Sequence, residues 1–93
     1  MEITINRSKT QEFFIDGNGE LHTPQDFKEN RLSDLSGLIF IIIADYCIRT
    51  SQNKISGDEF HALLSCRKME FDKDTVSALT SLEQHDYLKI ENL

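Results

Sequence analysis

The chain is short of the features that mark membrane, secreted and disulfide-stabilised proteins. Its 93 residues include no tryptophan, one proline and two cysteines. Two cysteines do not make the disulfide framework of a small secreted domain, so Cys47 and Cys66 are expected to be buried, reduced thiols. The longest apolar run, Leu38 to Ala44, is far shorter than the ~20 residues that span a bilayer. With no signal peptide at the start, we expect a cytoplasmic protein without membrane contact.

Basic residues are also scarce. Ten lysines and arginines stand against 16 acidic residues, which gives a net charge of −6. A protein that binds duplex DNA neutralises phosphates with lysine and arginine, so this balance disfavours nucleic acid and favours a protein partner. Hydrophobic residues make up 39% and charged residues 28% of the chain, as in an ordinary globular protein, and the length predicts one domain, residues 1–93.

Motifs for catalysis and for cofactor binding are missing from the sequence. There is no glycine-rich phosphate loop, nucleophile elbow or His-Glu metal motif, so we expect neither an enzyme nor a bound cofactor or metal. The stretch "DGNGELHTPQDF" resembles a calcium loop but fails on ligand order. Placing Gly19 at the obligatory glycine puts Phe14 at the first ligand position and Gln25 at the last. His61 and Cys66 are five residues apart and do not share a helical face.

The first 23 residues predict a small antiparallel β unit. Residues 2–6 alternate between apolar and polar, as in a half-buried strand. The stretches "QEFFID" and "ELHT" are two further strand candidates, and the turn sequence "DGNG" lies between them. Pro24 ends this unit, and "PQDFKENR" is expected to form a helical turn or a loop.

Three helices and a strand are predicted after that. Residues 35–47 are apolar nearly all round, which is typical of a central, buried helix, although the β-branched run at 41–43 also fits a strand. Ser56 and Glu59 form a capping-box pattern at the start of a short second helix, and "RTSQNK" before it is expected to be a polar loop. Asp72 is placed to cap a third helix, residues 72–86, whose apolar stripe is Val76, Leu79 and Leu82. Residues 87–91 then alternate as a last strand.

The order of these elements from Ser33 to Glu91 resembles the layout of the winged-helix superfamily. A central helix, a short capped helix, a longer helix and an immediate strand follow one another. The predicted fold is therefore α+β, with N-terminal antiparallel strands (1–23), a three-helix core and a C-terminal strand in a winged-helix-like part (32–91). The resemblance rests on element order alone and implies no functional residue. Because the chain ends after one strand, the N-terminal strands are candidates for the missing pairing partner.

A protein-binding function is the first of three hypotheses, and the weakest of them is an accessory subunit of an enzyme. An acidic module of this size without catalytic motifs fits an adaptor, inhibitor or regulator of another protein. Phe13 and Phe14 are adjacent, so a strand points them to opposite faces. One ring enters the core, and the other is exposed unless a helix covers it. Exposed aromatic side chains are common in protein interfaces. The candidate partner surface is Phe14, Phe27 and Tyr87.

The alternative is a winged-helix transcription regulator that reads DNA with residues 72–86. Such a protein places side chains that donate hydrogen bonds in the major groove, and a homodimer would double its phosphate contacts. Asp72 and Asp74 at the start of this helix suit the helix dipole but repel phosphate, so charge favours the first hypothesis. The candidate contacts under this alternative are Arg49, Lys54, Arg67, Lys68, Lys73, Thr75, Ser77 and Gln84.

Overall fold

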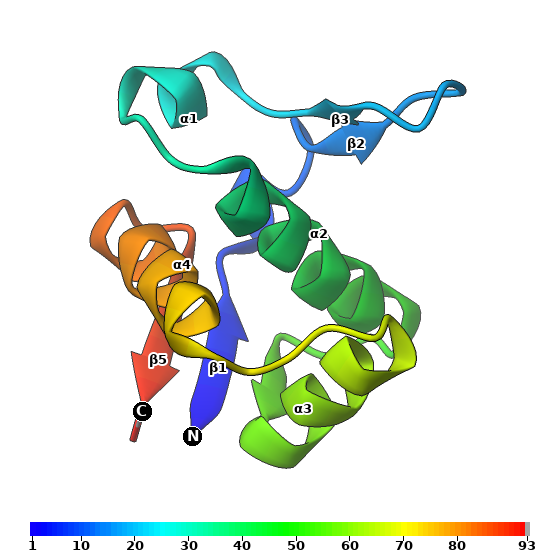
Figure 1. Ribbon diagram of the computed structural model, residues 1–93, viewed down its shortest axis with the longest axis vertical. Coiled ribbons are helices and arrows are strands. Elements are labelled where there is room, and N and C mark those ends of the chain that lie inside the picture. Colours follow the sequence, from blue (N-terminus) through cyan, green and yellow to red (C-terminus); the bar gives the residue numbers. More distant parts are fainter. Residues whose placement is uncertain (93) are drawn as a thin grey trace.

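The computed structural model describes residues 1–92, and of Asp26 only the backbone. The chain forms a mixed α+β domain, as predicted (Figure 1). In chain order, its elements are β1 (Glu2–Ile5), the 3₁₀ helix η1 (Arg7–Lys9), β2 (Phe14–Ile15), β3 (Leu21–His22), α1 (Gln25–Glu29), α2 (Asp34–Arg49), β4 (Lys54–Ser56), α3 (Gly57–Cys66), α4 (Lys73–Gln84) and β5 (Leu88–Glu91). Among residues 1–92, no helix is both long enough and apolar enough to cross a bilayer.

The strands form two separate antiparallel sheets. One has the order β4-β1-β5, with Ile3 of β1 between Ile55 of β4 and Ile90 of β5, and the other is the β2–β3 hairpin. The prediction that residues 1–23 form one β unit is therefore wrong, because β1 pairs with strands from the middle and the end of the chain. The prediction that residues 49–54 form a polar loop before the second helix is also corrected, because Lys54, the last of them, begins β4.

Helix α2 runs through the centre of the domain between the hairpin, α4 and the three-stranded sheet (Figure 1). Ser33 caps its first turn, where its hydroxyl accepts the backbone N–H of Ser36 at 3.1 Å. The β-branched run at 41–43 is helical, which excludes the strand alternative. One face of α2 enters the core with Ile39, Phe40, Ile43 and Cys47, and Leu79 and Leu82 of α4 belong to the same cluster.

Four aromatic rings form the centre of this core and involve two residues predicted to lie on the surface. Phe13, Phe27, Phe40 and Tyr87 contact one another with ring centroids 4.5 to 5.7 Å apart, mostly edge to face. The short helix α1 carries Phe27 into this cluster. Phe27 is 2% exposed and Tyr87 0% exposed, so their expected place on a partner surface is wrong. Packing an aromatic ring against other rings in the core is more favourable in free energy than leaving it in water.

The caps of α3 and α4 are local features that the sequence predicted. Ser56 Oγ accepts the N–H of Glu59 at 3.1 Å, and Glu59 Oε1 accepts the N–H of Ser56 at 3.0 Å, which completes the capping box. At α4, Asp72 Oδ1 accepts the N–H groups of Asp74 and Thr75, both at 3.1 Å. The pKa of Asp72 is lowered chiefly by the bond from the Thr75 backbone.

Two side-chain positions differ from the sequence prediction. Thr75 was expected on the outer face of α4 but is buried, and its hydroxyl donates to the carbonyl oxygen of Glu70 at 2.9 Å. Cys47 is buried as expected, whereas Cys66, the last residue of α3, is exposed. The last residue of a helix faces solvent more readily than a central one. The apolar residues before Cys66 wrongly suggested that Cys66 is buried too.

Candidate interaction groove

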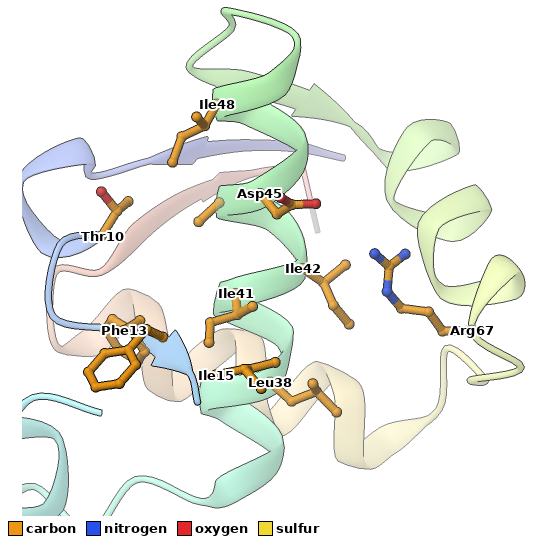
Figure 2. A pocket seen from close by; sticks show the side chains of 11 residues that line it. Thr10, Phe13, Ile15, Leu38, Ile41, Ile42, Asp45, Ile48 and Arg67 are labelled. Carbon is orange, nitrogen blue, oxygen red and sulfur yellow. The ribbon is translucent and has the colours of Figure 1, made fainter. Parts of the chain in front are cut away.

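The exposed apolar side chains gather in one place. Within residues 1–92, the large hydrophobic side chains that are clearly exposed are Phe14 (54%), Ile15 (51%), Leu38 (37%) and Ile48 (51%). All four line a single groove of about 440 Å³ between the β2–β3 hairpin and α2. Figure 2 shows Ile15 beside Leu38 at one end and Ile48 at the other.

Helix α2 forms the floor of this groove. Residues 38, 41, 42, 44, 45 and 48 line it, and each has another of them three or four residues away, so they share one side of the helix. The ten steps from Leu38 to Ile48 correspond to about 15 Å of helix. The opposite side of α2 belongs to the core. The helix is therefore apolar both toward the core and toward the groove. The expectation that residues 35–47 are buried all round is wrong at Leu38, and Ile48, just beyond that range, is exposed as well.

The hairpin forms one wall, and hydrogen bonds around Asp16 fix its shape. Asp16 Oδ1 accepts the N–H groups of Asn18 and Glu20 at 2.8 and 3.0 Å, and Oδ2 lies 2.7 Å from His22 Nε2. The bond with His22 is the main cause of the lowered pKa of Asp16. The His22 ring stacks on Phe14, with centroids 4.5 Å apart and planes 3° from parallel. These contacts hold Phe14 at the groove while leaving it exposed.

Gly37 lets the hairpin approach α2 closely. A Cβ atom at this position would come within 2.8 Å of Leu21 Cδ2 and 3.3 Å of Thr23 Cγ2, which is closer than carbon atoms pack without a shift. A side chain at position 37 would therefore require Leu21 or Thr23 to shift.

Two charged residues, Asp45 and Arg67, lie along the groove, and within residues 1–92 an ion pair is seen for Asp45 alone. Asp45 Oδ2 forms an ion pair with Arg49 Nη2 at 2.8 Å, one turn further along α2. Arg67 follows α3 and donates from Nη1 to the carbonyl oxygen of Leu63 at 3.1 Å. No acidic side chain in the described part of the chain lies within ion-pair distance of Arg67. Among the residues that the structure describes, the guanidinium of Arg67 thus has no ion-pair partner.

One group of side chains has the composition of a metal site. The ligand atoms of Asp16, Glu20 and His22 lie within 4.8 Å of one another on the hairpin. The hydrogen bond between Asp16 and His22 accounts for the approach of those two, and Glu20 is fully at the surface of the turn. The closeness of these side chains is thus explained by a hydrogen bond that joins the two strands of the hairpin. That the protein binds no metal stays a prediction.

The residues proposed for DNA contact are spread over several elements. Arg49 pairs with Asp45, Lys54 Nζ lies 3.6 Å from Glu2 Oε1 in the sheet, and Arg67 lines the groove. Thr75 is buried. The exposed candidates on or just before α4 are Lys68, Lys73, Ser77 and Gln84.

Of the predicted partner surface, Phe14 lies in the groove, whereas the sequence reasoning missed Ile15, Leu38 and Ile48. A signal for the last two was present. Leu38, Ile41 and Ile48 fall on the side of α2 opposite Ile39 and Ile43, so a helical projection shows a second apolar stripe.

Comparison of the chain with family models, with curated proteins and with solved structures gave no match. The proposed function therefore rests on the groove and on the residues that line it.

Proposed function

We propose that this domain is a non-catalytic module that binds another protein in the groove between the β2–β3 hairpin and α2. The observation that carries the proposal is the gathering of Phe14, Ile15, Leu38 and Ile48 in one hollow. Single exposed apolar residues are ordinary, but a contiguous apolar patch with polar residues at its edge is typical of a protein interface. An adaptor, an inhibitor or a regulator of a cytoplasmic protein fits these properties.

The size of the groove favours a reversible complex. Complete burial of a large apolar side chain contributes about 1.5–3 kcal/mol, so covering four side chains that are about half exposed contributes roughly 3–6 kcal/mol. Association itself costs at least about 4 kcal/mol in lost translational and rotational freedom. Polar contacts at the edge of the groove must therefore add to the affinity, and Arg67 is placed to supply one.

The proposal is tested by changing the groove without changing the fold. Ile48→Asp adds a negative charge to the apolar stripe at a half-exposed position, and Gln84→Asp makes the same change in charge on the exposed part of α4. Proteins retained by the immobilised wild type from an extract of its own cells should be lost with Ile48→Asp and kept with Gln84→Asp. Matched melting curves of the three proteins would exclude unfolding. Equal retention by all three would refute the proposal.

Binding of DNA through α4 is the second candidate, favoured by the exposure of Lys68, Lys73, Ser77 and Gln84. Lys68 and Lys73, even with Arg67, would neutralise only about three phosphates per chain, which gives weak binding with a shallow salt dependence. Titration with mixed-sequence duplex DNA at about 50 mM salt tests this, with Lys73→Glu as the variant. Micromolar binding that the variant abolishes would favour DNA over protein as the partner.

We also infer that the domain is a variant of the winged-helix layout in which β1 takes the place of a second wing strand. The order α2, α3, α4, β5 along the chain and the antiparallel pairing of β1 with β5 support this inference. In this arrangement β1 lies between β4 and β5 and pairs with both of them. An experimental structure in which β1 does not pair with β5 would contradict it.

A further inference from the structure

We propose that the groove takes an amphipathic α-helix of the partner, with apolar residues along one face and an acidic side chain directed at Arg67. This inference rests on the proposed function and specifies the chemistry of the partner. It follows from the shape of the groove and from the charge within it.

The shape of the groove fits a helix. Its floor is a stripe of α2 about 15 Å long, which matches roughly three turns of a second helix. Figure 2 shows Thr10 and Phe13 on one side of α2 and Arg67 on the other, so the floor has a boundary on both sides. Apolar residues at i, i+4, i+7 and i+11 on the incoming helix span about 16 Å, which is enough to reach Leu38, Ile41 and Ile48.

An extended peptide fits this surface less well. Strand addition requires a row of free backbone N–H and C=O groups, whereas the floor of the groove is a helix whose backbone groups are paired within it. The adjacent strand, β2, has only two residues, Phe14 and Ile15, and so offers a very short edge.

The charge in the groove selects an acidic contact. Asp45 is paired with Arg49, but Arg67 has no acidic partner within the described residues. The chain as a whole carries a charge of −6 and would attract a basic partner, so an acidic contact at this position is a specific consequence of Arg67. An ion pair at an exposed edge of this kind changes affinity by about two- to five-fold.

A second copy of the chain is a poorer occupant. An isologous interface brings the same surface together from both chains, and two hollows do not fill each other. Each copy would also add a charge of −6 to the pair. Self-association is therefore kept as one outcome of the test.

The test uses two displayed peptide libraries of about 16 residues, enough for four helical turns. Both have apolar residues at i, i+4, i+7 and i+11 and random charged positions, and the second carries central prolines that prevent a helix. Selected peptides are titrated by fluorescence anisotropy against the wild type and three variants. Ile48→Asp tests the apolar stripe, Arg67→Glu the charge, and Lys68→Glu is the control, since it makes the same charge change next to the groove without lining it.

The helical library should yield binders that carry an acidic residue. Ile48→Asp should weaken them by about tenfold or more, because it places a charge where an apolar side chain of the helix has to be buried. Arg67→Glu should weaken them about two- to five-fold, and lysine in place of the peptide's acid should restore that loss. Lys68→Glu should leave affinity unchanged.

Several results would overturn this inference. They are enrichment from the proline library, no enrichment from either library, and helical binders indifferent to Arg67→Glu. A dimer in sedimentation velocity that Ile48→Asp abolishes would also overturn it, in favour of a second copy. If Ile48→Asp removes proteins retained from the extract while the helical library gives no binder, the proposed function stands and the helical partner does not.

Discussion

Three isoleucines of α2 provide a direct test of which side of the helix is the core. Ile43 is 0% exposed and lies in the main hydrophobic cluster, Ile42 is 3% exposed beneath the groove, and Ile48 is 51% exposed at the end of the groove. The change to alanine is the same in each case and is made in the same helix. Helix propensity therefore changes equally, and the differences in stability report the surroundings of each side chain.

The expected losses differ several-fold. Ile43→Ala removes three carbon atoms from a closed core and should lower the free energy of unfolding by about 2–5 kcal/mol. The loss for Ile42→Ala should lie near the lower end of this range, at about 2 kcal/mol, because water in the groove can fill part of the space that the side chain leaves. Ile48→Ala should lower it by less than about 1 kcal/mol, since half of the side chain is already in water. For a domain of this size, each 1 kcal/mol corresponds to about 4–8 °C in Tm.

Urea unfolding followed by far-ultraviolet circular dichroism measures these differences. The slope with denaturant should be equal in all four proteins, so that shifts of the midpoint report stability alone. If Ile48→Ala costs as much as Ile43→Ala, the groove is closed in solution and the proposed docking surface does not exist. Equal and small losses at all three positions would show that α2 is not the central helix.

The other predictions concern caps, thiols and ions. Ser56→Ala should destabilise the domain by about 0.5–2 kcal/mol in the same urea experiment, because it removes one half of the capping box. In the native protein, a thiol reagent should label Cys66 quickly and Cys47 only on unfolding, since burial shields Cys47 and raises the pKa of its thiol. The hairpin around Gly19 should not respond to calcium, and a rise in Tm with millimolar calcium would contradict the failed ligand order. The pKa of Asp72 in the folded protein is below its ordinary value of 3.8. The stability that its cap contributes is therefore complete above pH 3.8 and is lost as the pH falls through the lower, folded pKa. Asp72→Asn should flatten the fall of Tm in acid.

The parts of the fold that could be predicted from sequence depend on near neighbours. The caps at Ser56 and Asp72, the turn around Gly19 and the helical state of α2 are each set within a few residues. The three-stranded sheet is not, because it joins residue 3 to residues 55 and 90, and only packing decides that partnership. Strand β4 contributes a single buried side chain, Ile55, and one apolar residue in a polar stretch gives no periodic pattern.

The groove was harder to predict because a helix that is apolar all round has two explanations. It is either enclosed by its own domain or shared with a partner, and the sequence of α2 is the same in both cases. A 93-residue domain has little material with which to surround a 16-residue helix, and small domains bury a lower fraction of their surface. Here the core takes up one side of α2, the hairpin covers part of the other, and Leu38 and Ile48 stay exposed. Because folding does not use these side chains fully, a substitution at Ile48 should separate the two roles, with a small effect on stability and a large effect on binding.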